Sequence, residues 1–168
     1  MQTESDSRIH LIGIISDTHG LLRPEVFEAL MGVHVILHAG DVGGDDILDA
    51  LNEIAPTYAV TGNTDAPDDP RLAGVIEQEY GGLRVHVSHG HELGVPTPEK
   101  LLAAYSAEVL IYGHTHRQLV VRAGSRLVVN PGAAGQRRFK LSPCVAKLTI
   151  RDRSADAKLI PLEDRDGT

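Results

Sequence analysis

Five short apolar runs in this chain each end in a glycine-flanked cluster of aspartate, asparagine or histidine. The clusters are Ser16-Asp17-Thr18-His19-Gly20, Gly40-Asp41-Val42-Gly43-Gly44, Gly62-Asn63-Thr64-Asp65, His89-Gly90-His91 and Gly113-His114-Thr115-His116. Apolar runs of this length are typical of buried strands, and in an open α/β sheet ligands bind beyond the carboxyl ends of the strands. The recurrence therefore predicts strands whose ends bring these side chains to one shared crevice.

The first half of the chain alternates β-branched runs with amphipathic segments. Residues 9–15, 33–37 and 57–60 are expected to form strands, and residues 24–31 and 46–54 to form helices between them. Strands that alternate with helices of this length indicate βαβ units and a parallel sheet that is buried on both faces. The expected fold class is α/β, or α+β by some schemes.

The second half is richer in hairpin signals. Turn formers over 66–70 interrupt the alternation, and three pairs of strands follow, each flanking a turn. The expected pairs are 75–80 with 83–87, 119–121 with 127–129, and 145–150 with 157–160. A helix over 98–105 with Thr97 as its N-cap and a strand over 109–112 are expected between the first pair and the second.

Length and composition narrow the class of protein. The chain has 168 residues, 42% hydrophobic and 23% charged, which suits one folded domain over residues 1–168. Residues 1–7 are polar and are expected to form a loose N-terminus rather than a secretory signal. No apolar run approaches the roughly 18 residues that a membrane-spanning helix needs. We therefore expect a cytoplasmic protein that does not span a membrane.

The charge balance bears on possible partners. The chain has 23 Asp and Glu residues against 16 Lys and Arg residues, a formal net charge of −7, and it has no basic run. Such a chain repels the phosphate backbone of a long nucleic acid, so nucleic acid is not an expected partner. The single cysteine, Cys144, can form no internal disulfide and lacks the companions of a thiolate metal site.

The clusters offer imidazole, carboxylate and amide ligands without thiolate. This set favours a divalent ion such as Mn, Fe or Zn over a soft metal, and so many histidines disfavour calcium. The seven candidate ligands are Asp17, His19, Asp41, Asn63, His89, His114 and His116. Seven groups exceed what one four-coordinate ion uses, so two ions that share a carboxylate fit better. Two ions about 3.5–4 Å apart are suited to phosphoryl transfer, which makes phosphoester hydrolysis the expected reaction.

Each cluster taken alone has a simpler structural interpretation. An Asp-X-His after a strand is more often a cap or a turn, and Gly-Asp and Gly-Asn are common in turns and at helix starts. His89 could be an ordinary histidine at a strand end, and His114 with His116 is only a moderate metal signal. The metal interpretation is favoured because all five clusters follow buried strands, which independent accidents would not do.

In their order these clusters resemble the motifs of the calcineurin-like metallophosphoesterase superfamily: Asp-X-His, Gly-Asp, Gly-Asn, a later His, and Gly-His-X-His. The resemblance covers about residues 9–140. The length and the Gly-Asn-X-Asp form are similar to the small single-domain phosphodiesterases of bacteria and archaea. The resemblance implies a β-sandwich flanked by helices and two divalent ions as cofactors, with Mn expected first and Fe, Zn, Ni or Co as alternatives.

The resemblance also implies a role for each ligand. Asp17, His19 and His116 would hold one ion, Asn63, His89 and His114 would hold the other, and Asp41 would bridge them. A hydroxide held between the ions would then attack phosphorus in line, without a covalent phosphoenzyme.

One position departs from the family pattern. Many members follow Gly-Asn with a histidine that protonates the leaving group, whereas this chain has Thr64. Esters whose leaving oxygen departs easily should then be hydrolysed best, because general-acid help is worth about 10²–10⁴-fold in rate. Asp65 or His91 is the expected substitute, although Asp65 is equally suited to capping the turn or orienting a ligand.

Two further sets of residues are weaker candidates. Arg137 and Arg138 follow Asn130-Pro131-Gly132, and this segment resembles the family's loop after its last hairpin. Contact with the substrate phosphate is one hypothesis for these arginines, and a solvent-facing position is the other. Four histidines are placed in or beside strands and are assigned no role: His10, His34, His38 and His86.

Two classes of function compete. The leading one is a metal-dependent phosphodiesterase acting on a small phosphoester, with phosphomonoesterase or protein phosphatase as alternatives among the enzymes. The other class is a non-catalytic protein-binding scaffold, because the same fold serves that purpose in the eukaryotic retromer complex, where ligand positions have decayed. All seven ligand positions are intact here, which favours the enzyme. Metal storage or sensing has no independent support, and a homo-oligomer through the apolar C-terminal hairpin is left open.

Overall fold

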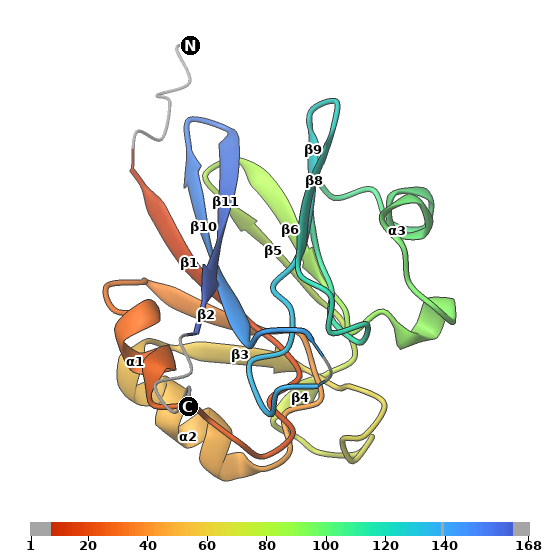
Figure 1. Cartoon of the computed structure of the whole chain (residues 1–168). Helices are drawn as coiled ribbons and strands as arrows, with labels where there is room; N and C mark the ends of the chain where they lie inside the picture. Colours follow the sequence, from red (N-terminus) through yellow and green to blue (C-terminus); the bar gives the residue numbers. More distant parts are fainter. Residues whose placement is uncertain (1–7, 139, 163–168) are drawn as a thin grey trace.

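Two β-sheets lie face to face in the computed structural model, which describes residues 8–138 and 140–162 (Figure 1). The first sheet has the order β11 (Ser154–Pro161), β10 (Cys144–Arg151), β1 (His10–Ile15), β2 (Val35–His38), β3 (Thr57–Val60) and β4 (Leu72–Ala73). The second has the order β5 (Ile76–Tyr80), β6 (Leu83–Val87), β7 (Val109–Ile111), β9 (Arg126–Asn130) and β8 (Leu119–Ala123). The segment 1–7, expected to be loose, lies outside the described residues.

The first sheet contains the predicted βαβ units. Strands β1, β2 and β3 are parallel, with Ile12 opposite Val35 and Ile36 opposite Thr57. The helices α1 (Glu25–Ala29) and α2 (Asp45–Ile54) connect these strands and lie together on one side of the sheet (Figure 1). Helix α1 is shorter than the expected 24–31 because the chain leaves the helix at Leu30.

The second sheet contains two of the three predicted hairpins, β5 with β6 and β8 with β9, while the third, β10 with β11, joins the first sheet. The strands β6, β7 and β9 run parallel to one another. Helix α3 (Pro98–Ala104) connects β6 to β7, and the Thr97 side chain caps it by accepting a hydrogen bond from the Lys100 backbone N–H. The parallel strands are thus divided between two sheets.

Two short elements were not predicted from the sequence. The two-residue strand β4 pairs with the edge of β3, and the 3₁₀ turn η1 (His91–Leu93) comes directly after the His89 cluster. Both are too short to show a hydrophobic period. No helix in the described part of the chain has the length and apolarity needed to cross a membrane.

The core is layered because side chains alternate across each strand. On β1, Ile12 and Ile14 face the space between the sheets, whereas Ile15 packs outside the first sheet with Val26 of α1 and Leu51 of α2. Burying an aliphatic side chain of this size stabilises a fold by roughly 1.5–3 kcal/mol. A third cluster packs α3 on the outer face of the second sheet. This packing fixes the strand ends from which the polar clusters emerge.

Candidate metal centre

Six of the seven predicted ligands form two groups at the ends of β1, β2, β6 and β7. The first group is Asp17, His19 and His116, and the second is Asp41, His89 and His114. Within each group, the potential ligand atoms all lie within 4.8 Å of one another. The sequence had suggested a crevice along the edge of one open sheet. The strands that position the ligands belong to both sheets, so the crevice lies between two facing sheets instead.

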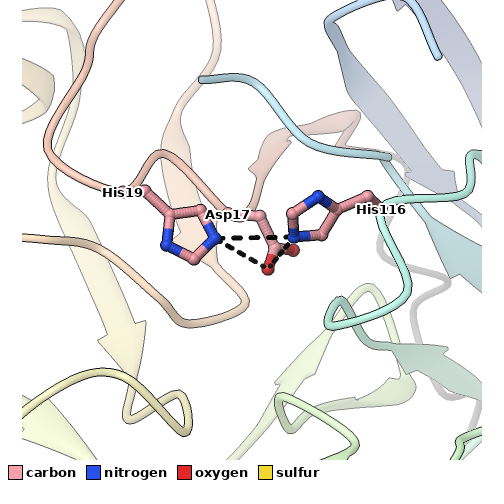
Figure 2. A group of neighbouring side chains, drawn as sticks. All are labelled: Asp17, His19 and His116. Atoms are coloured by element: carbon pink, nitrogen blue, oxygen red, sulfur yellow. Dashed lines mark hydrogen bonds and ion pairs between the residues drawn. The ribbon is translucent and has the colours of Figure 1, made fainter. Parts of the chain in front are cut away.

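The first group converges on one carboxylate oxygen (Figure 2). Asp17 Oδ1 lies 3.3 Å from His116 Nε2 and 3.8 Å from His19 Nε2, and the two imidazole nitrogens are 3.4 Å apart. Asp17 Oδ1 is buried and accepts no hydrogen bond from the described residues. A buried carboxylate oxygen without a partner is unfavourable, and a cation among these three atoms would satisfy it. The residues therefore fit a divalent ion.

The other oxygen of Asp17 holds the side chain in this orientation. Asp17 Oδ2 accepts hydrogen bonds from the Ser16 hydroxyl at 2.6 Å and from the His114 backbone N–H at 3.2 Å. The second bond links the loop after β1 to the loop after β7. One candidate ligand thus positions the backbone of another.

The second group gathers around His89. Its Nε2 lies 3.3 Å from Asp41 Oδ2, 3.3 Å from His114 Nδ1 and 2.9 Å from Asn63 Oδ1. Asn63 Oδ1 is also 3.1 Å from His114 Nδ1, so the predicted amide ligand lies in this group. The ring of His89 is oriented by its other nitrogen, Nδ1, which is 2.8 Å from the Ala39 carbonyl oxygen. This bond leaves Nε2 directed at the centre.

Asp41 is shared between the groups. Its Oδ2 lies 3.3 Å from His89 Nε2 in the second group and 3.7 Å from His19 Nε2 in the first. Its Oδ1 accepts a hydrogen bond from the Thr64 backbone N–H at 2.9 Å. Burial opposes ionisation, but the hydrogen bonds from His89 and Thr64 outweigh it, and the pKa of Asp41 lies well below its usual range. The carboxylate is therefore charged and fixed between both groups.

The backbone at the candidate ligands is strained. Seven non-glycine residues in the described ranges have positive φ angles, and five of them are Asp17, His19, Asp41, His114 and His116. This left-handed conformation costs of order 1–3 kcal/mol per residue and persists where the surrounding structure enforces it, commonly at functional sites. The remaining two, Asp152 and Arg153, form the turn between β10 and β11. The strain is concentrated at the centre.

Two glycines of the motifs are required by close packing. A Cβ atom on Gly62 would collide with the carboxylate Oδ1 of Asp41, and one on Gly113 would collide with the Ser16 hydroxyl and crowd Asp17 Oδ2. Both contacts are made by groups that orient candidate ligands. These glycines therefore allow neighbouring loops to approach the carboxylates.

His38 is a residue of the centre that sequence reasoning left without a role. It is fully buried at the end of β2, and its Nδ1 accepts a hydrogen bond from the Gly40 backbone N–H at 3.1 Å. Its Nε2 lies 2.9 Å from the Thr18 hydroxyl, which donates to the Val42 carbonyl. Burial lowers the pKa of His38 to about 4, so the ring is neutral and donates from Nε2. His38 thus ties the loop after β1 to the loop after β2. Its place beside the Gly-Asp motif was the only available signal.

The structure also places the two candidate leaving-group donors. Asp65 accepts hydrogen bonds from the backbone N–H groups of Val42, Gly43 and Gly62 at 2.9–3.2 Å, an arrangement that favours its alternative role of holding the turn. His91 is partly exposed, and its ring centroid is 5.3 Å from that of His89 and 6.3 Å from that of His114.

Arg137 and Arg138 are exposed. The segment before them, 131–135, packs on the loop after β1: the Ala134 N–H donates to the Ser16 carbonyl at 2.9 Å. The Arg23 guanidinium, in turn, donates from Nε to the Gly135 carbonyl at 2.8 Å. The two arginines thus follow a segment anchored beside the first ligand group.

Comparisons with known proteins agree with this geometry. The family model of the calcineurin-like phosphoesterase superfamily domain matches residues 11–153. A probable metallophosphoesterase of Methanocaldococcus jannaschii is 35% identical over 164 residues, covering 92% of this chain and 82% of that protein. A phosphodiesterase of the same archaeon is 28% identical over 139 residues, covering 72% of this chain and 82% of that protein.

A solved structure extends the comparison to the fold. Vps29 of Chaetomium thermophilum superposes with a TM-score of 0.83 at 24% identity, covering 95% of this chain and 92% of that chain. At this identity the likeness shows a shared fold and leaves the chemistry to the site itself. The sandwich flanked by helices that the sequence led us to expect is confirmed.

Proposed function

The chain belongs to the calcineurin-like phosphoesterase superfamily, a family of metal-dependent hydrolases, and we propose that it is a phosphodiesterase that uses two divalent ions. The observation that carries the proposal is the position of Asp41, whose Oδ2 faces His19 of one ligand group and His89 of the other. A carboxylate in that place is suited to bridging two ions. The set of imidazole, carboxylate and amide ligands suits Mn, which we expect to support activity best, with Fe, Zn, Ni or Co as alternatives.

The chain's own residues would hold and orient the reacting groups. Asp17, His19 and His116 would bind one ion, and Asn63, His89 and His114 the other, with Asp41 between them. Two ions bound there would lower the pKa of a shared water to about 7, giving a bridging hydroxide, and would neutralise the charge that develops on the phosphoryl oxygens.

In the proposed hydrolysis, the oxygen of water forms a new bond to phosphorus and the bond to the leaving oxygen breaks. The leaving oxygen then gains a proton, and the remaining arm stays on the phosphate as a monoester. His91 lies beside the second ligand group and is the proposed hydrogen-bond donor to the leaving oxygen. We propose that Asp65 acts by holding the loops after β2 and β3, and that Arg137 or Arg138 contacts the phosphate.

One comparison favours diesters over monoesters: of the two relatives from M. jannaschii, the one that is 28% identical is named a phosphodiesterase. A cavity of about 630 Å³ opens beside Asn63 and has room for an ester arm, which diesters and monoesters both have. Phosphomonoesterase and protein phosphatase activity are the alternatives within the same chemistry.

The proposal is tested by the hydrolysis of bis(p-nitrophenyl) phosphate beside p-nitrophenyl phosphate. The protein is first treated with a chelator, then reloaded with Mn, and compared with the variant Asp41→Asn. We expect turnover of the diester that requires metal and is lost in the variant. A preference for the monoester would move the substrate class to phosphomonoesters. No turnover of either ester with any divalent ion would contradict the enzyme proposal and favour a binding scaffold.

A further inference from the structure

The cavity beside Asn63 is bounded by three segments of the chain. Its walls are the loop after β3, the connection from β4 to β5, and η1. Asn63, which lines it, places its Oδ1 2.9 Å from His89 Nε2. The cavity therefore opens directly from the second ligand group, and a molecule bound there would be continuous with a phosphate at the centre.

The lining combines apolar and polar side chains in similar number. Pro67, Leu72 and Val75 supply the apolar part, and Val75 is 46% exposed. Small-molecule sites in proteins are typically about 300–1,000 Å³ and mostly apolar, with a few polar groups that fix orientation. At about 630 Å³ this cavity has the size for a ring-shaped ester arm.

The charged residues that line the cavity are acidic. They are Asp65 and Glu92, and no lysine or arginine is found among the described lining residues. The Asp65 carboxylate is occupied by backbone N–H groups of the neighbouring loops. Glu92, whose side chain is 34% exposed, adds a second negative charge to the lining.

Glu92 is held in place by two hydrogen bonds. Its Oε1 accepts from the Tyr105 hydroxyl at 2.8 Å, and its Oε2 accepts from the Gly90 backbone N–H at 3.0 Å. Burial disfavours the charged form, but hydrogen bonds, first from the backbone N–H of Glu92 itself and then from groups that include Tyr105 and Gly90, outweigh it and lower the pKa of Glu92 below its usual value. The cavity wall thus carries a fixed negative charge.

We propose that this cavity binds the leaving arm of the phosphodiester, and that Glu92 makes it select neutral or cationic arms over anionic ones. The inference rests on the proposed phosphodiesterase function and names the substrate class of that same site. His91 lines the cavity together with Asn63, so the proposed donor and the arm that departs are on the same side of the centre. An arm with its own phosphate or carboxylate would be repelled by Glu92.

The experiment compares two diesters that differ in the charge of the leaving arm. Methyl p-nitrophenyl phosphate has a neutral arm, and methyl m-carboxy-p-nitrophenyl phosphate has an anionic arm whose phenol leaves with similar ease. With Mn-loaded wild-type protein we expect kcat/KM to be about tenfold higher for the neutral arm, the size of effect that one nearby charge produces across a partly hydrated cavity.

Three variants locate the source of that preference. Glu92→Gln removes the charge and should reduce the preference to less than about threefold. Tyr105→Phe removes a hydrogen bond to Glu92 but keeps its charge, so the preference should remain. Glu79→Gln, which removes a charge on β5 outside the cavity lining, is the matched control and should change nothing. Calorimetric titration with Mn verifies that the ligand groups of each variant still bind metal.

The outcomes separate the inference from the function on which it rests. Turnover of both esters without a charge preference in the wild type would overturn the subsite and leave the phosphodiesterase proposal standing. An unchanged preference in Glu92→Gln, or an equal loss in Tyr105→Phe, would also overturn it, because the charge of Glu92 would then not be the cause. Absence of turnover for both esters would instead contradict the proposed function.

Discussion

The two ligand groups of the centre use similar residue types but are held differently. In the second group, the His89 side chain is fully buried, and its Nδ1 is fixed by the Ala39 carbonyl. In the first group, the His19 side chain is 27% exposed and that of His116 is 12% exposed. Among the described residues, neither of these two rings has a hydrogen bond to its Nδ1. The second group therefore contains one histidine, His89, that the protein itself orients, whereas the first group has none, although His114 of the second group is also only partly buried.

This difference predicts two unequal metal sites. A ligand set that is already oriented loses less conformational freedom when the ion binds, and hydrogen bonds behind metal-binding histidines are typically worth 10–100-fold in affinity. The buried Asp17 Oδ1, which has no hydrogen-bond partner among the described residues, belongs to the first group. An ion bound there would stabilise this oxygen, although the histidine rings of the group are less firmly oriented. We expect tight binding at the second group and exchangeable binding at the first.

The predicted difference in affinity between the two sites is tested most directly by removing one histidine from each group. His89→Gln should abolish the tight site and lower Mn affinity by more than about 10²-fold, because a ligand and its anchoring bond to Ala39 are both lost. His19→Gln should weaken only the exchangeable site. Calorimetry and metal analysis after dialysis measure both effects. Equal losses in the two variants would show that the groups are equivalent.

The two groups also differ in their neighbours, because the proposed leaving-group donor, His91, lies beside the second group. His91→Gln should slow the hydrolysis of diesters with alkyl leaving groups by about 10²-fold, the lower end of general-acid effects, and leave p-nitrophenyl esters nearly unchanged. Rates for a matched pair of such esters give the measurement. A uniform loss for both esters would assign His91 a different role.

Asp65 is predicted to behave in the opposite way. Asp65→Asn weakens the hydrogen bonds that join the loops after β2 and β3, and hydrogen bonds to a charged group are worth about 1.5–3 kcal/mol. Metal-dependent activity should therefore fall about tenfold or more, equally for esters with good and poor leaving groups. A loss confined to poor leaving groups would restore the acid role considered from the sequence.

His38 gives the smallest expected effect and tests the link between the first and second loops. The pKa of His38 is lowered to about 4 by burial, against 6.5 in the unfolded chain, so the folded protein binds fewer protons between these values. The folded state therefore loses stability as the pH falls through that window. Asp17, Asp65 and Asp41 oppose this shift, and His89 adds to it.

The variant His38→Gln should lower the free energy of unfolding by about 1 kcal/mol near neutral pH, because the bond from the Gly40 N–H is lost. It should also flatten the decline in acid: the wild type loses about 2 kcal/mol by pH 5, so the two proteins converge near pH 6 and the variant is the more stable one at about pH 5. Urea unfolding of the chelated proteins near neutral pH and at about pH 5 measures this. An identical pH dependence would show that His38 does not supply the slope.

Much of the fold followed from the sequence because its signals are local. The apolar run 57–60 was predicted as a strand and forms β3. Thr97 was predicted as an N-cap, and its side chain caps the start of α3. What could not be predicted depends on tertiary pairing. β4 is a strand only because Ala73 lies opposite Val60, and no local pattern shows that β6 and β7 belong to a second sheet.

The candidate site divides in the same way. The ligand types and their order along the chain were visible, and the structure brings Asp17, Asp41 and His89 together. The role of His38 could not be inferred, because its partners Thr18 and Gly40 become neighbours only when β1 and β2 pair. The strained angles at the ligands were equally hidden, since they arise where five loops meet.

The central claim is that Asp41 joins two unequal ion sites. A calorimetric titration of the chelated protein with Mn, repeated on Asp41→Asn, tests it most directly. We predict two ions per wild-type chain, one bound tightly and one weakly, and a loss of affinity at both sites in the variant, because Asp41 faces both ligand groups. A single ion in the wild type, or a variant that still binds two ions with unchanged affinity, would contradict the account.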